Sequence, residues 1–242
     1  MRLITSLLFA TAAKTALASL RPQDQLPLSP TSTPSKAEAV QKALSKSSII
    51  PEVLSDFMPK CFITAYYSKD SGKTHQGTVD LGNEFKPKET KQKPGLSITC
   101  PDSKGTPGLV VALTDPDAKS RDDPKWSEMC HWIYIVPINF QTTFEAELGA
   151  QAKNSLPELV IPASVWQESD FVDYKPPGPP PKTGFHRYVF VVLEGDTTNL
   201  TAPSERQHWG TGKVRHGVRD WAEQEDLKVV GANWFVEEDE EQ

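Results

Sequence analysis

Short apolar runs rich in β-branched and aromatic residues recur along the middle of the chain, between clusters of Pro, Gly, Asp and Lys. Runs of five to nine residues bounded by turn-forming residues are typical of β-strands. The pattern therefore predicts a mainly β chain. The expected strands are CFITAYY (61–67), LSITC (96–100), GLVVALT (108–114), HWIYIVPI (131–138) and HRYVFVVLE (186–194).

Three segments have the spacing of helices instead. Residues 36–45 place Ala39, Val40, Ala43 and Leu44 on one face, and residues 218–227 do the same with Val218, Trp221 and Ala222. Residues 51–57 begin with Pro at a position suited to the first helical turn. We also expect two long loops, 82–94 and 146–169.

Composition narrows the class of protein. The 242 residues are 37% hydrophobic and 24% charged, which suits one domain with extensions. With 26 basic and 32 acidic residues, the net charge of −6 argues against a nucleic-acid partner. The 21 prolines disfavour a helix bundle. After the first two dozen positions, no run is long enough for an integral membrane segment.

The first 18 residues resemble a secretory signal. Arg2 precedes an apolar run over 3–13, and Ala16-Leu17-Ala18 has the form of a cleavage site. Lys14 interrupts this layout, so a mitochondrial presequence is the alternative. We expect a secreted or secretory-pathway protein, in which Asn199-Leu200-Thr201 is a glycosylation acceptor.

The remaining chain divides into three parts. Residues 19–47 form a Pro-rich leader with a short helix, and residues 48–236 form the main domain. Residues 237–242 (EEDEEQ) form an acidic tail, which we expect to be solvated because blocks of like charge repel one another.

Two polar segments flank the predicted strands and could form one site. Asp115 begins the first, which leads to His131, and the second leads to His186 and Tyr188. Strand ends gather in a sandwich, so these side chains could meet, and imidazole and phenol groups suit an anionic ligand. The alternative is structural: Asx turns in DPD and satisfied edge residues in HRY.

The same segments resemble the signature regions of the phosphatidylethanolamine-binding protein family. The family pattern consists of TDPDAPSR, a D-P pair, a strand His, a G-P-P loop and GxHRY. The similar segments of this chain are, in the same order, residues 114–121, 123–124, 131, 178–180 and 184–188. The resemblance implies an antiparallel Greek-key β-sandwich with a few peripheral α-helices, one near the C-terminus. It implies a ligand pocket of Asp115, Trp126, His131, Gly178, Pro179, His186 and Tyr188, with Asp117, Ser120 and Arg121 supporting the loop.

Three positions depart from the family pattern. Lys119 replaces a proline, Trp126 replaces a pocket tyrosine, and Cys130 replaces a histidine before His131. Adjacent strand residues face opposite sides, so Cys130 is expected to point away from the pocket and not to act as a nucleophile.

No metal or cofactor is expected, because His75, His208 and His216 lack ligand spacing to one another or to cysteine. Three cysteines allow one bridge. Cys61 with Cys100 is our first choice, since Cys130 adjoins the expected site, although spacing does not fix the pairing.

The sequence favours a binding or accessory protein over a stand-alone enzyme. The main hypothesis is a protein that binds a small phosphate or carboxylate ligand. Two alternatives follow from the family resemblance: a serine carboxypeptidase inhibitor, as in yeast, and an accessory protein for a dimerising cyclase in fungal maleidride biosynthesis.

Overall fold

A computed structural model describes residues 33–68, 75–101, 108–137, 158–161 and 170–241. The expected signal (1–18) and residues 19–32 of the expected leader lie outside these residues. Within the described part of the chain, no helix is long and apolar enough to span a membrane.

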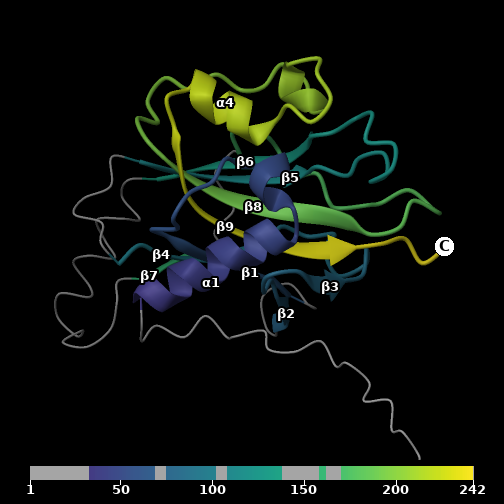
Figure 1. Ribbon diagram of the computed structural model, residues 1–242, viewed down its shortest axis with the longest axis horizontal. Coiled ribbons are helices and arrows are strands. Elements are labelled where there is room, and N and C mark those ends of the chain that lie inside the picture. The colour runs from purple at the N-terminus through teal and green to yellow at the C-terminus, as the bar shows by residue number, and fades with distance from the viewer. Residues whose placement is uncertain (1–32, 69–74, 102–107, 138–157, 162–169, 242) are drawn as a thin grey trace, which may run out of the picture.

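Two β-sheets form the body of the protein (Figure 1). One has the strand order β2-β1-β4-β7 and the other has the order β3-β9-β8-β5-β6. All described pairings are antiparallel except that of β3 with β9. The strands are β1 (Phe62–Ser68), β2 (His75–Thr78), β3 (Asn83–Phe85), β4 (Gly95–Thr99), β5 (Leu109–Asp115), β6 (Met129–Val136), β7 (Glu158–Ile161), β8 (His186–Glu194) and β9 (Lys228–Glu237).

The five-stranded sheet is buried on both faces, which explains why its central strands are almost continuously apolar. On β5, Val111 and Leu113 pack between the two sheets, whereas Val110 and Ala112 pack under the helices. Full burial of the valine and leucine side chains contributes roughly 1.5–3 kcal/mol each. The sandwich therefore has two apolar layers, one on each side of this sheet.

Helices α1 (Thr33–Lys46) and α4 (Val218–Gln224) confirm two of the three predicted helices. Val40 and Leu44 of α1 are buried in the same layer as Val218 and Trp221 of α4. A short 3-10 helix, η2 (His208–Gly210), lies before α4. The short helix that was grouped with the leader thus packs on the sheet as part of the core.

The predicted helix over 51–57 is wrong. Helix α2 (Ile49–Glu52) ends where that helix was expected to begin, and Ile50 has an extended ψ of 119°. A residue before proline avoids the helical region because the proline ring crowds it. The chain turns instead, and Val53 and Leu54 enter the core.

All five predicted strands are confirmed within one to two residues at most ends, but four others were missed. Strands β3 and β7 lie in the expected loops 82–94 and 146–169. Strand β9 extends through Glu237, which is buried and not solvated. The expectation of a solvated tail is therefore wrong at its first residue, because that residue is held in the sheet.

Irregular segments cover the outer edge of β6. Ile133 N–H donates to the Val172 carbonyl at 3.1 Å, and Cys130 N–H donates to the Arg206 carbonyl at 2.8 Å. Lys175 N–H donates in turn to the carbonyl of His131 at 2.7 Å. The backbone around His131 is thereby fixed from outside the sheet as well as from within it.

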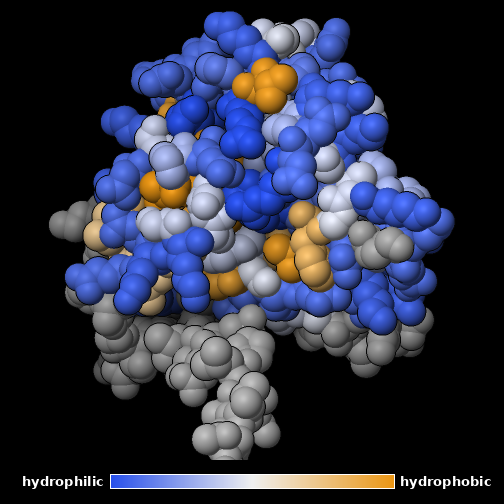
Figure 2. Space-filling view, turned by 45° about the vertical axis from the view of Figure 1, so that its right-hand side comes forward, coloured by the Kyte–Doolittle hydropathy of each residue, from blue (hydrophilic) through white to orange (hydrophobic). Residues whose placement is uncertain are grey.

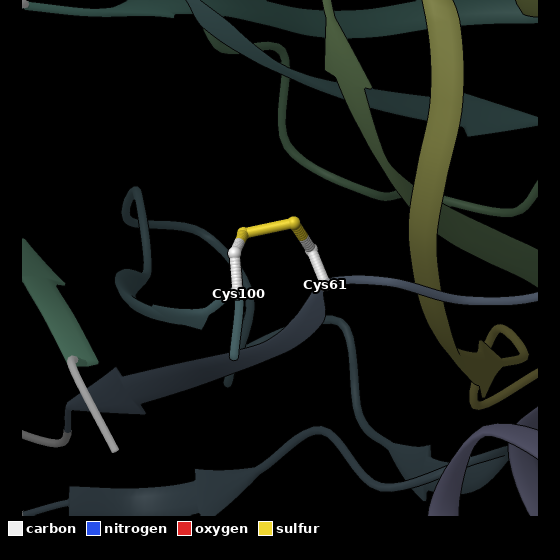
Figure 3. The surroundings of a disulfide bond; sticks show 2 residues. All are labelled: Cys61 and Cys100. Carbon is white, nitrogen blue, oxygen red and sulfur yellow. A yellow bond between two sulfur atoms is a disulfide. The ribbon is translucent and has the colours of Figure 1, made fainter. Parts of the chain in front are cut away.

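A disulfide joins Cys61, at the start of β1, to Cys100, at the end of β4 (Figure 3). This is the pairing favoured from the sequence. It links the ends of two neighbouring antiparallel strands across 39 residues of sequence.

Removing this bridge in a Cys61→Ala, Cys100→Ala variant should lower the free energy of unfolding by about 4 kcal/mol, because the unfolded chain regains the entropy of an open loop. Urea denaturation without reductant measures the change. Cys130→Ala is the matched control, since it removes a thiol and leaves the bridge. Equal stability of the double variant and wild type would contradict the expectation.

Candidate functional site

Four polar residues that the sequence separates lie at one end of the inter-sheet layer. Asp115 ends β5, His131 is near the start of β6, and His186 begins β8. Tyr188 follows two residues later on the same face as His186. The centroid of its ring lies 5.3 Å from that of the His131 ring and 6.4 Å from that of the His186 ring. The end of β9 marks this end of the sheet, near the label C in Figure 1.

A β-bulge turns His131 toward Tyr188. Leu113 pairs with Trp132 and Thr114 pairs with Cys130, so His131 has no opposite residue on β5. An extra residue of this kind changes the direction of a side chain on the bulged strand. Cys130 consequently lies in the layer under the helices, away from His131, as predicted.

His186 is held between an acid and a hydroxyl group. Its Nδ1 lies 2.9 Å from Asp115 Oδ2, and its Nε2 lies 3.0 Å from Thr183 Oγ1. The Thr183 hydroxyl donates to the Pro180 carbonyl at 2.7 Å, so it accepts from Nε2. With both ring nitrogens donating, His186 is an imidazolium.

The electrostatics agree with this geometry. Burial opposes a charge on His186, but the hydrogen bond and the negative charge of Asp115, aided by Asp117, outweigh it and raise the pKa of His186. The pair Asp115–His186 is therefore an almost fully buried ion pair.

His131 has the opposite character. Its Nδ1–H donates to the Lys175 carbonyl at 2.8 Å, and burial lowers its pKa despite the nearby charge of Asp115. The ring is thus a neutral imidazole whose Nε2 carries the lone pair. This nitrogen can accept a hydrogen bond from a ligand.

Tyr188 supplies a donor beside that acceptor. Gly178 N–H donates to the Tyr188 hydroxyl at 3.2 Å, which leaves the phenolic proton for another partner. Its ring stacks on Phe235 at 5.2 Å, and burial followed by the charge of Asp115 raises its pKa well above 10.0. The phenol therefore remains protonated.

Arg187 fixes the loop that follows β5. Its Nε and Nη2 donate to the two oxygens of Asp117 at 2.8 and 2.7 Å, and Nη2 also donates to Glu52 at 2.7 Å. Nη1 reaches the Ser47 carbonyl at 2.8 Å. Asp117 thus links the loop after β5 to Arg187 of β8.

The other predicted residues differ in their burial and in their contacts. Ser120 braces the loop locally, since its Oγ accepts from Asp123 N–H at 3.1 Å. Pro179 is buried beside Gly178, whereas Trp126 is half-buried under the amine of Lys125. Arg121 is exposed, and among the described residues its side chain makes no hydrogen bond or ion pair.

Sequence reasoning missed Glu237 and its partners. Glu237 pairs across the strands with His186, and its Oε2 accepts from the Thr90 hydroxyl at 2.7 Å. The Thr90 carbonyl accepts from Tyr174, whose hydroxyl lies 3.3 Å from that of Tyr67. The alternation of β9 could have placed Glu237 inward, but the acidic run after it indicated solvent.

A second missed acid, Glu128, lies on the other side of the sheet. It accepts hydrogen bonds from the Thr114 hydroxyl at 3.0 Å and from Val218 N–H at 3.3 Å. Burial raises its pKa to about 8. Through these contacts it joins the start of β6 to α4, and it does not share the face of His131.

Neither thiol nor metal chemistry is indicated in the described part of the chain. Burial raises the pKa of Cys130 to about 12, so it is a poor nucleophile. Among the described residues, no three His, Cys, Asp or Glu side chains gather as a metal site requires.

Comparison with solved structures gives the fold class. The carboxypeptidase Y inhibitor in complex with its cognate proteinase superposes with a TM-score of 0.67 at 24% identity, over 84% of this chain and 97% of the other. The phosphatidylethanolamine-binding protein of Plasmodium vivax superposes with a TM-score of 0.59 at 20% identity, over 83% and 98%. The fold is that of the phosphatidylethanolamine-binding proteins.

Sequence comparison gives the family. The family model "phosphatidylethanolamine-binding protein" matches residues 70–235, and the chain belongs to this family. The carboxypeptidase Y inhibitor of Saccharomyces cerevisiae is 26% identical over 231 residues, covering 84% of this chain and 96% of the relative. The protein MOTHER of FT and TFL1 homolog 2 of Oryza sativa is 27% identical over 169 residues, covering 67% and 76%.

The two histidines should titrate on opposite sides of their ordinary value of 6.5. Imidazole NMR should show His186 titrating above it and His131 below it, and Asp115→Asn should lower the pKa of His186. Because the folded-state pKa of His186 is raised, its contribution to stability is complete below pH 6.5 and is lost as the pH rises through the folded value. Titration of His186 below that of His131 would contradict the assignment.

Proposed function

We propose that the protein binds a small anionic ligand at the site formed by Asp115, His131, His186 and Tyr188. The carrying observation is that the Tyr188 O–H has no acceptor among the described residues and lies near the His131 Nε2 acceptor, on rings 5.3 Å apart. This pair suits a group with both an anionic oxygen and an O–H, such as a phosphomonoester monoanion or a half-protonated dicarboxylate.

The surroundings support the same ligand class. The imidazolium of His186 places a positive charge beside Tyr188, and Asp115 balances that charge within the buried pair. Gly178 is exposed in the loop above Tyr188, where a residue without a side chain leaves the backbone accessible to a ligand. Pro179, Trp126 and Arg121 are proposed to complete the rim.

Calorimetric titration with phosphorylethanolamine and with an alkyl maleate should give saturable binding, and a His131→Ala, His186→Ala variant should bind at least about tenfold more weakly. The loss removes an acceptor and a cation, each of which is worth more than about 1 kcal/mol in a buried site.

His216→Ala is the control, because His216 is half-exposed and paired with Asp220 away from this group. A preference for the maleate would support the proposed accessory role beside a dimerising cyclase. Unchanged affinity in the double variant would remove the histidines from the site, and no binding of either compound would refute the proposal.

A second candidate function is inhibition of a serine carboxypeptidase. The observation that favours it is the likeness to the yeast carboxypeptidase Y inhibitor, which extends over 96% of that relative. In this proposal the residues before α1 and the exposed loops meet the enzyme, and the anion site has a separate role.

Carboxypeptidase Y activity should fall on addition of the protein, and removal of residues 19–32 should weaken the inhibition. The deletion stops before α1, because Leu44 and Val40 belong to the core. The phosphorylethanolamine titration on the same truncated protein controls for folding. Undiminished inhibition by the truncated protein would exclude the leader, and no inhibition by either protein would exclude the function.

A secretory location is part of the proposal. The Cys61–Cys100 disulfide suits an oxidising compartment, and Asn199 of the acceptor tripeptide is exposed. Cleavage after residue 18 and glycosylation at Asn199 are the corresponding processing steps.

A further inference from the structure

Glu237 lies beside residues of the proposed anion site, although no motif includes it. It pairs across the strands with His186, and Phe235, two residues earlier on β9, stacks on Tyr188 between the sheets. Because side chains two residues apart share a face, Glu237 projects into the same layer as His186 and Tyr188. Its side chain is completely buried.

The two oxygens of Glu237 have different environments. Oε2 accepts the Thr90 hydroxyl at 2.7 Å. Oε1 is buried without a hydrogen-bond partner in the described part of the chain. Buried polar atoms are rarely left unpaired, and those that are often mark a place where something else binds.

The groups around Glu237 favour a neutral carboxyl. Burial raises its pKa to about 7, opposed by the Thr90 hydrogen bond and by His186 and assisted by Glu89 and Asp115. The titratable groups that face it are His186 and Tyr188 from β8, Asp115 from β5, Tyr67 from β1, Glu89 from the turn after β3, and Tyr174.

We propose that protonated Glu237 is a ligand-binding residue of the anion site: its Oε1–H donates to an oxygen of the bound anion, and binding at neutral pH takes up a proton from solvent. This inference rests on the proposed anion-binding function. The buried Asp115–His186 pair is neutral overall and His131 is uncharged. An ionised Glu237 would therefore give the site a net negative charge, which would repel the anionic ligand.

The consequence is affinity that depends on pH in a defined direction. Below neutral pH Glu237 is already protonated, and above it each bound anion requires a proton from solvent. If only the protonated form binds, the affinity falls about tenfold between about pH 6 and about pH 8. Glu237→Gln keeps the shape and an N–H donor but removes this titration.

Calorimetry with sulfate tests the proposal, since sulfate does not change charge in this range. Sulfate has no O–H for His131 Nε2, so any proton that His131 takes up to donate to it is taken up by wild type and variant alike. At about pH 7, in buffers of different ionisation enthalpy, wild type should take up about half a proton more per sulfate than Glu237→Gln. His131 and His186 are present in both proteins, so the difference isolates Glu237. Glu238→Gln, at the half-buried neighbouring position, is the matched control and should behave as wild type.

Equal proton uptake in wild type and Glu237→Gln, with sulfate bound by both, would overturn this inference and leave the anion-binding function in place. No sulfate or phosphorylethanolamine binding by wild type at any pH would overturn both. If the variant fails to fold, infrared titration replaces it, in a Glu128→Gln background because Glu128 is a second buried carboxylic acid. The remaining buried carboxylic acid signal should persist to higher pH with sulfate, and an unchanged midpoint would overturn the proposal.

Discussion

The site depends on the contact between the buried guanidinium of Arg187 and the carboxylate of Asp117. The guanidinium holds Asp117 through two parallel hydrogen bonds and reaches Glu52 and the Ser47 carbonyl, so the loop after β5, the α1–α2 connection and β8 meet at one charge. Breaking such a pair leaves an uncompensated buried charge, at a cost of about 3–5 kcal/mol. Because adjacent strand residues face opposite sides, this contact also sets the position of His186 in the other layer.

The two motifs thus meet as two pairs of acid and base on opposite faces of one sheet. Asp117 with Arg187 stabilises the loop, and Asp115 holds His186 as an imidazolium at the candidate site. Between the sheets the imidazolium is neutralised by its own acid, so the site has polar groups of both kinds but little net charge. The ligand proposed for this site would be recognised by donor and acceptor geometry together with proximity to the cation.

The central strands were predictable because they are buried on both sides and read as continuous apolar runs. The convergence of Asp115, His131, His186 and Tyr188 followed from strand ends and from the family motifs. The bulge that turns His131 was not predictable, because it depends on the register with β5. Glu237 was missed for a similar reason: its partner Thr90 is 147 residues away, and only the fold shows that this acid is inside. The helix expected after Pro51 does not form, and Val53 and Leu54 enter the core from a turn instead.

The segments that cover the outer edge of β6 do more than fix the backbone around His131. An uncovered edge strand offers a row of free N–H and C=O groups on which another chain can pair. Here those groups are taken by the segments that contain Val172, Lys175 and Arg206, and at the opposite edge β3 has only three residues. The five-stranded sheet therefore offers little backbone for strand addition, so its very apolar interior strands are protected from edge-to-edge aggregation. Much of Figure 2 shows a hydrophilic surface with apolar side chains in small separate groups, which favours the same outcome.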